Sequence, residues 1–347
     1  MLNTRLCELL DIQYPIILAS MAWISDADLA AAVSSAGGLG TIGPNAGQVK
    51  VTPDVQETGE RLKEQIRRVR ALTDRPFAVN FVVGAPGKDR EFSDRCVEVG
   101  IEEKVPVAII SQGGPRLYTQ RLKDTGMKVI HVCTTVEHCK KAEQTGVDAV
   151  IVTGTEGGGH SGFHRLTTFC LVPQAVDSVQ IPVIAGGGIG DERGFMAALA
   201  LGAEGVYVGT RFIATKECPA HDNVKQMILN ARDTSSISLM HGLPSVEGQG
   251  DRGFVEERRG FVRMIIPDSL RPHFKQGTYD ELSAIIDKKG VSGDSWYLTT
   301  QIKGDVSAGT AAGQVAGMIK DIPTCEELID KMTAGSKKVL KRLSGTR

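Results

Sequence analysis

The stretch with the strongest chemical signal is GTEGGGHSG at residues 154–162, in which five glycines surround Glu156 and His160. Histidine gains or loses a proton near neutral pH, which suits it to acid–base chemistry. Glycines leave the backbone bare, so a flat ligand could lie against it. The alternative is a flexible loop with an incidental histidine. Two roles stay open for Glu156: it could orient His160 or cap the loop.

Two further glycine-rich segments predict a phosphate site. Residues 185–194 read AGGGIGDERG, and residues 209–215 read GTRFIAT. Bare backbone amides near the start of a helix attract anions, because the helix dipole adds to their charge. The residues that would supply an amide or a hydroxyl are Gly186, Gly187, Gly188, Gly209 and Thr210. Close packing of a helix on a strand could explain one such loop, but two loops in register favour phosphate.

A few polar residues interrupt otherwise apolar runs. Asn80 lies within FAVNFVV, and Lys128 and His131 lie within MKVIHV. Cys133 directly follows the second of these runs. Each has a structural alternative: a buried amide satisfied by backbone, an exposed lysine at a strand edge, a core histidine, and a small buried hydrophobe. From spacing alone, we favour the exposed lysine and the buried cysteine.

Eight short apolar runs separated by helical patterns must position these residues. The runs are PIILA (15–19), GLGTI (38–42), FAVNFVV (77–83), PVAIIS (106–111), MKVIHV (127–132), DAVIVT (148–153), IPVIA (181–185) and GVYVG (205–209). Near-continuous apolar runs are typical of parallel strands buried on both faces. Helix caps are expected at Ser25 and Asp191. Eight alternating strands and helices predict an α/β fold, a (β/α)8 TIM barrel. An open dinucleotide-binding sheet is disfavoured, since no G-x-G-x-x-G follows the first run.

This order places the chemistry at one end of the predicted barrel. The histidine segment follows the sixth strand, and the two phosphate-type segments follow the seventh and eighth. Active sites of such barrels form on the loops that follow the strands, with phosphate commonly after strands seven and eight. We therefore expect a single site built from these loops.

The alternation stops after the eighth strand. We predict a barrel formed by residues 1–216 and 304–347, interrupted by a mainly helical subdomain at 217–303 that shapes the substrate side. The segment GFVEERRGFVRMIIP within it lacks the spacing of strands.

Composition excludes several classes of protein. Lys and Arg total 40 against 41 Asp and Glu, so no net field attracts nucleic acid or an anionic membrane. Seven scattered cysteines without C-x-x-C spacing argue against a zinc site and for a reducing compartment. The amino-terminal segment does not read as a signal peptide, and no run reaches the length of a membrane span. We expect a cytoplasmic protein without a metal site.

Several segments together resemble the nitronate monooxygenase family, also called 2-nitropropane dioxygenase-like proteins. They are YPIILASMAW, LAAAVSSAGGLGTIG, RPFAVNF, GTEGGGHSG, IPVIAGGGI and ALALGAEGVYVGTRFIATKEC. The likeness covers essentially the whole chain, and its most specific mark is G-x-E-x-G-G-H-x-G. The resemblance implies a flavin mononucleotide (FMN) barrel related to flavin-type enoyl-acyl carrier protein reductases and NADH:quinone reductases.

The resemblance also implies roles for individual residues. Ser20, Met21 and Ala22 would line the flavin ring through backbone contacts. Asn80 would contact the ring, and Lys128 would lie near its N1/O2 edge, where a cation stabilises reduced flavin. The glycines and threonine that would border the flavin or hold its phosphate are Gly154, Gly159, Gly186, Gly187, Gly188, Gly209 and Thr210. His160 matches the active-site histidine of the family.

Oxidation of nitronates with dioxygen through the bound flavin is the first function implied, with His160 as base or hydrogen-bond donor. The alternative is an NAD(P)H-dependent flavin reductase that acts on quinones or enoyl thioesters. An IMP dehydrogenase-like barrel is disfavoured because GTEGGGHSG lacks the cysteine that such enzymes need. A protein that only binds flavin is a non-enzymatic alternative. Expected partners are a small-molecule substrate with dioxygen or NAD(P)H, and a second copy in a homodimer.

Overall fold

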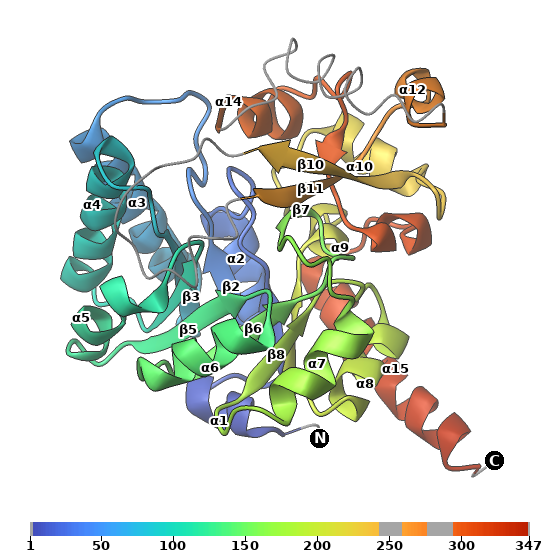
Figure 1. Cartoon of the computed structure of the whole chain (residues 1–347), viewed down its shortest axis with the longest axis horizontal. Coiled ribbons are helices and arrows are strands. Elements are labelled where there is room, and N and C mark those ends of the chain that lie inside the picture. Colours follow the sequence, from blue (N-terminus) through green and yellow to red (C-terminus); the bar gives the residue numbers. More distant parts are fainter. Residues whose placement is uncertain (1–2, 243–258, 276–293, 346–347) are drawn as a thin grey trace.

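A computed structural model describes residues 3–242, 259–275 and 294–345 (Figure 1). Its centre is an eight-stranded parallel sheet in the order β1-β9-β8-β6-β5-β4-β3-β2. The strands are β1 (Ile16–Leu18), β2 (Gly40–Ile42), β3 (Phe77–Val82), β4 (Val107–Ser111), β5 (Lys128–Cys133), β6 (Ala149–Thr153), β8 (Val183–Gly186) and β9 (Gly205–Val208). Each coincides with one of the eight predicted runs, which confirms the TIM barrel.

The sheet closes between its first and last strands. The Leu18 N–H donates to the Leu39 carbonyl over 2.9 Å, and the Leu39 N–H donates to the Ile16 carbonyl over 2.9 Å. Leu39 directly precedes β2, so these bonds join β1 to β2 and remove the free sheet edges. Closure brings the carboxyl ends of all eight strands to one rim.

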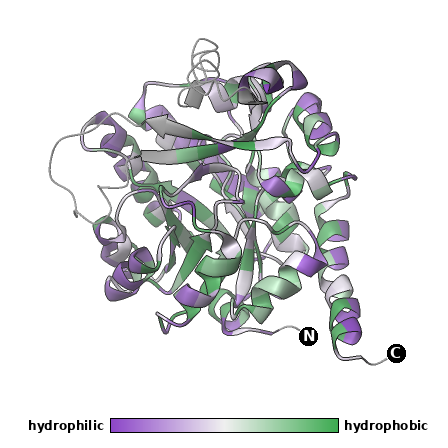
Figure 2. Ribbon diagram, turned by 45° about the vertical axis from the view of Figure 1, so that its right-hand side comes forward, coloured by the Kyte–Doolittle hydropathy of each residue, from purple (hydrophilic) through white to green (hydrophobic). Residues whose placement is uncertain are grey.

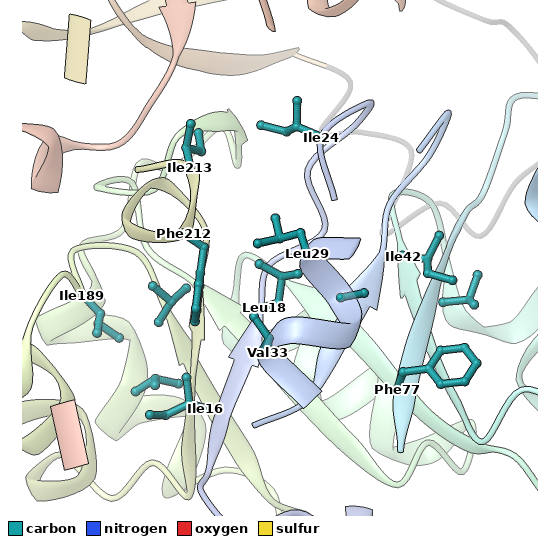
Figure 3. Packing of buried hydrophobic residues seen from close by; sticks show 14 of the residues in the cluster. Ile16, Leu18, Ile24, Leu29, Val33, Ile42, Phe77, Ile189, Phe212 and Ile213 are labelled. Atoms are coloured by element: carbon teal, nitrogen blue, oxygen red, sulfur yellow. The ribbon is translucent and has the colours of Figure 1, made fainter. Parts of the chain in front are cut away.

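Alternate residues of the strands pack into two apolar layers. Ile17 points into the barrel, where it joins Leu6 of α1 (Arg5–Leu10), which plugs the amino end. Leu18 belongs to the larger layer between strands and helices, together with Leu29 and Val33 (Figure 3). Apolar residues concentrate on the strands and polar residues on the outer helices (Figure 2). The barrel is therefore a filled core, and only its rim can receive a ligand.

Helices surround the barrel. They are α2 (Ala27–Ser35), α3 (Val55–Leu72), α4 (Lys88–Glu102), α5 (Thr119–Lys123), α6 (Val136–Gln144), α7 (Thr168–Val176), α8 (Glu192–Ala200) and α15 (Cys325–Leu343), with a 3-10 turn η1 (Pro115–Leu117) before α5. Asp191 caps α8, as predicted. Helix α15 begins with a capping box at Thr324 and packs on α8 and α2. The chain thus returns to the barrel after the upper sheet. Among the described residues, no helix combines the length and apolar character that a membrane crossing requires.

A second sheet lies above the rim (Figure 1). Strands β10 (Ser236–Gly242), β11 (Arg259–Ile265) and β12 (Thr310–Ala311) are neighbours in it, and β7 (Gly159–Ser161) pairs antiparallel with β11. The helical segments around it are α9 (Thr210–Ile213), α10 (Asp222–Leu229), η2 (Asp268–Leu270), α12 (Arg271–Lys275), α14 (Asp294–Tyr297), the π-helix η3 (Leu298–Ile302) and the 3-10 helix η4 (Gln314–Met318).

The described part of the predicted insertion has more helix than strand, but it also contributes two seven-residue strands. The expectation that GFVEERRGFVRMIIP forms no strand is therefore wrong, because β11 lies within it. The period of two was hidden in β11 because the sheet is covered on both faces. Ile265 packs with the barrel layer, whereas Met264 packs with Ile237 and Trp296 on the far face. The division at residues 217 and 304 stays a prediction, although β12 and β7 come from outside it.

The prediction that Ser25 caps α2 is wrong, because the cap is the next residue, Asp26. Asp26 caps the helix by accepting the Leu29 N–H over 3.0 Å. The Ser25 hydroxyl instead accepts the Met21 N–H over 2.9 Å and donates to the Ala19 carbonyl over 3.1 Å. Ser25 thereby shapes the loop after β1. Burial raises the pKa of the Asp26 carboxyl from 3.8 to about 6, although the hydrogen bond from Leu29 opposes this shift.

We expect Asp26→Asn to stabilise the protein at pH 7.5 but not at pH 4. A carboxyl whose pKa is raised by folding stabilises the folded state at low pH, and this contribution is lost as the pH rises through about 6. Asparagine keeps the cap without the buried charge. Urea unfolding should give the variant an advantage of about 2 kcal/mol at pH 7.5. The same advantage at both pH values would contradict this account.

Candidate functional site

The loops after β1 and β9 meet at the rim of the barrel. A Cβ placed on Gly209 would lie 3.3 Å from the Ala19 Cβ and 3.5 Å from the Met21 sulfur. The Ser20 N–H donates to the Tyr207 hydroxyl over 2.7 Å, which ties the first loop to β9. The structure thus brings the predicted Ser20–Ala22 segment next to a predicted phosphate loop.

The loop after β8 has the geometry of an anion cradle. Gly187 and Gly188 have φ angles of 91° and 75°, so two consecutive residues adopt a left-handed conformation that favours glycine. Within the described part of the chain, no acceptor receives the N–H groups of Gly187, Gly188, Gly209 or Thr210. Free backbone amides on loops that follow neighbouring strands can bind anionic oxygens. The residues present therefore fit a phosphate group. Gly186 ends β8, and its carbonyl accepts the Gly154 N–H over 2.9 Å.

Glu156 holds the histidine segment to helix α7. Its carboxylate accepts the Thr168 N–H and the Thr168 hydroxyl, each over 2.9 Å. Its own carbonyl accepts the Gln314 N–H over 2.9 Å, and the Gly313 N–H donates to the Thr210 hydroxyl over 2.9 Å. Of the two roles left open for Glu156, these contacts support capping.

Replacing Glu156 by alanine should therefore loosen the whole rim. We expect a loss of about 2 to 3 kcal/mol in the free energy of unfolding, because the hydrogen bonds from Thr168 to the charged Glu156 carboxylate are removed. Flavin affinity should fall as well. Glu217 offers a matched control, since its carboxylate accepts the Cys325 N–H at the start of α15 over 2.9 Å. Glu217→Ala should lower stability but leave flavin affinity, measured by fluorescence titration, unchanged. Equal flavin affinity in both variants would contradict the role of Glu156.

The glycines of the histidine segment mainly permit backbone to pack on backbone. A Cβ on Gly154 would lie 2.3 Å from the Thr168 backbone nitrogen, and one on Gly158 would lie 2.7 Å from the Ala312 carbonyl carbon. Gly159 has a φ of 76°, and a Cβ placed on it would lie 3.7 Å from the Tyr297 hydroxyl oxygen. The interpretation that these glycines leave room for a flat ligand is therefore only part of their role.

His160 lies in a strand and not in a slack loop. In β7 it pairs with Val262 of β11, and its side chain is exposed. Directly opposed residues of an antiparallel pair project from the same face of a sheet. Val262 packs with the apolar cluster of the upper sheet, beside Tyr297. His160 thus shares the far face of the upper sheet with Val262, while its neighbours in β7 share the face toward the barrel. Its catalytic role stays a prediction.

Two predicted flavin contacts have different outcomes. Asn80 is 6% exposed; its amide donates to the Ile109 carbonyl over 3.2 Å and accepts from the Ser111 hydroxyl over 3.0 Å. These bonds match the structural alternative, and the contact with flavin stays a prediction. Lys128 is an exposed first residue of β5, paired with Val107 at the amino end of β4. The structure does not bring Lys128 to the rim. Lys128 is the first residue of β5 and lies at the amino end of the barrel, whereas the rim is formed at the carboxyl ends of the strands.

The two other candidates on β5 belong to the core. Burial lowers the pKa of His131 to about 3, so its imidazole stays neutral. Burial also raises the pKa of the Cys133 thiol well above its usual range, which excludes a reactive thiolate. Both structural alternatives are supported.

Three residues of the rim were missed by the sequence analysis: Thr168, Tyr207 and Arg263. Each is a polar residue within or beside an apolar run. This interruption of the apolar pattern is the feature by which the sequence could have identified them. Arg263 is the strongest case, as a charged residue in the middle of GFVRMII. Among the described residues, no cluster of three or more His, Cys, Asp or Glu side chains could hold a metal ion.

Comparison with known proteins decides the family. The chain matches the nitronate monooxygenase family over residues 3–335. It belongs to this family. It is 33% identical to a (3aS,4S,5R,7aS)-5-hydroxy-7a-methyl-1-oxo-octahydro-1H-indene-4-carboxyl-CoA dehydrogenase of Rhodococcus jostii, over 100% of this chain and 99% of that protein. It is 35% identical to a probable nitronate monooxygenase of Staphylococcus saprophyticus, over 70% of this chain and 78% of that protein.

Among solved structures, FabK from Thermotoga maritima is similar with a TM-score of 0.80 and 34% identity, over 99% of both chains. These relationships confirm the sequence-based assignment of family and fold. They also make the protein an enzyme, a flavin-dependent oxidoreductase that acts on a small molecule. The free amides after β8 and β9 are the features of the rim that fit the phosphate of a flavin nucleotide.

Proposed function

We propose that the chain is an FMN-dependent oxidoreductase that adds a hydride at the β-carbon and a proton at the α-carbon of an acyl thioester, or removes both. The observation that carries the proposal is the extent of the likeness to the Rhodococcus jostii CoA-thioester dehydrogenase, which includes the insertion and its upper sheet. FabK matches over the same extent. A relative that covers the whole chain is a better guide to the substrate than one that covers 70% of it.

The cofactor assignment rests on the rim. The amides of Gly187, Gly188, Gly209 and Thr210 would hold a terminal phosphate, which FMN carries and riboflavin lacks. FMN, when bound, supplies the hydride chemistry that side chains cannot perform. The chain contributes orientation through the fixed Ser20–Ala22 loop. His160, by its match to the histidine of the family, would move a proton at the substrate.

Oxidation of nitronates is the second candidate, and the family match together with the Staphylococcus saprophyticus relative favours it. Both candidates use the same rim. They differ in the electron donor. A thioester reductase takes hydride from NAD(P)H, whereas a nitronate oxidase takes electrons from the nitronate and passes them to dioxygen. NAD(P)H as co-substrate, a homodimer and a cytoplasmic location remain predictions.

Anaerobic mixing separates the candidates. The purified protein is mixed first with NADH, and then crotonyl-CoA is added while the flavin absorbance at its visible band is followed. The proposal expects rapid bleaching by NADH and recovery on addition of the thioester. Bleaching by propyl nitronate alone, with no response to NADH, would instead establish the nitronate reaction. Bleaching by neither would reject both.

A further inference from the structure

A buried cationic cluster lies between the histidine segment and the upper sheet. Its centre is Arg263 of β11, whose side chain is 4% exposed. The Nε of Arg263 donates to the Thr155 carbonyl over 2.6 Å, and one Nη donates to the Ser236 hydroxyl over 3.3 Å. The other Nη has no hydrogen-bond partner in the described part of the chain. No carboxylate there lies within ion-pair distance of this guanidinium.

The strand register places further unsatisfied groups around Arg263. Ser238 of β10 is directly opposite Arg263, so both side chains project from the same face of the sheet. The hydroxyls of Ser238 and Thr155 are buried and have no hydrogen-bond partner among the described residues. Buried polar groups are normally satisfied, and a cluster of exceptions points to an absent ligand.

A second arginine extends the cluster to the surface. Arg165 is exposed, and its guanidinium lies over the Phe261 ring, 4.8 Å from the centroid. Burial lowers the pKa of Arg263 and the charge of Arg165 adds to that shift, while the Glu156 carboxylate opposes it. Two cations, one of them desolvated, favour an anion between them. Guanidinium groups match phosphate oxygens in particular.

We propose that Arg263 and Arg165, with Ser238 and Thr155, bind a phosphate group of a nucleotide-bearing substrate. The chemistry is shared by the phosphates of a CoA thioester and the diphosphate of NAD(P)H. The inference rests on the proposed function for the identity of these substrates. It concerns a site distinct from the free amides after β8 and β9, because Arg263 and Ser238 come from the insertion and not from the loops after those strands.

The test compares Arg165→Met and Arg263→Lys with the wild-type holoenzyme. Arg165 is exposed, so its variant should fold. Arg232→Met is the matched control, since Arg232 is an exposed arginine of the insertion that pairs with Asp268. KM and kcat are measured for crotonyl-CoA, for crotonyl-pantetheine, which lacks the phosphates, and for NADH. Calorimetric titration with CoA, NADH and inorganic phosphate gives affinities that do not depend on turnover.

We expect each site variant to raise the KM for crotonyl-CoA about 10-fold, with kcat and the KM for crotonyl-pantetheine unchanged. A rise in the KM for NADH instead would support the phosphate site and assign it to that nucleotide. Equal changes for both thioesters, unchanged KM values, or binding of inorganic phosphate only would overturn the proposal. If the wild type turns over no thioester, the proposed function fails, whereas the calorimetric comparison still decides the site.

Discussion

Replacing His160 with alanine is expected to lower kcat about 100-fold or more while the flavin stays bound, because general acid–base catalysis contributes about that much. His160 is exposed in a three-residue strand and lies outside the apolar core, so the substitution should leave the core intact. Folding and flavin content, measured by absorbance, should therefore be those of the wild type. Steady-state turnover with the thioester and with the nitronate gives the result for each candidate reaction.

His164→Ala is the control for that experiment. His164 is an exposed histidine four residues further along the same segment. Its removal should leave kcat unchanged, so a general effect of altering the segment can be recognised. Unchanged turnover of His160→Ala with every substrate would show that this histidine is not catalytic and that the family resemblance misleads at this position.

Replacing Gly187 with alanine is expected to abolish retention of the flavin. The added Cβ would meet the Gly154 carbonyl oxygen at 2.8 Å, and the φ of 91° already disfavours any side chain. The loop must move, and the amides of Gly187 and Gly188 would no longer converge on a phosphate. We expect the affinity for FMN, measured by fluorescence titration, to fall by about two orders of magnitude, which corresponds to one or two lost hydrogen bonds to a charged group.

Gly126→Ala supplies the matched control. Gly126 has a similar φ of 88°, but a Cβ there has nothing within 4 Å. It lies before β5, at the amino end of the barrel, so the substitution tests backbone strain alone. The variant should lose about 1 kcal/mol of stability and keep the wild-type affinity for FMN. If both variants bind FMN equally, the loop after β8 does not hold the phosphate.

The barrel could be predicted from sequence because its strands are buried on both faces. Such strands leave continuous apolar runs, and the helices between them begin at recognisable caps such as Asp191. The upper sheet could not be predicted in the same way. Arg263 faces inward within β11, so a charged residue stands where the sequence pattern would suggest exposure. Its partners, Thr155 and Ser236, are far away in the chain.

The rim was predicted in its location but not in its internal contacts. Position after a strand is enough to identify Gly187 and Gly209 as neighbours of one site, since parallel strands end at one rim. Sequence could not show that Glu156 bonds to Thr168, because that contact depends on how the segment folds back onto α7. For Lys128, the family resemblance predicted a contact with the flavin that the structure does not support. Its position at the start of β5 keeps it from the rim.

The most direct test of the central claim, that the rim holds FMN by its phosphate, is a titration of the flavin-free protein with FMN and with riboflavin. The two ligands share the ring system and differ in the phosphate. Because the free amides after β8 and β9 can donate hydrogen bonds to the phosphate, which riboflavin lacks, FMN should bind about 100-fold more tightly than riboflavin. Equal affinities, or no binding of FMN, would contradict the account.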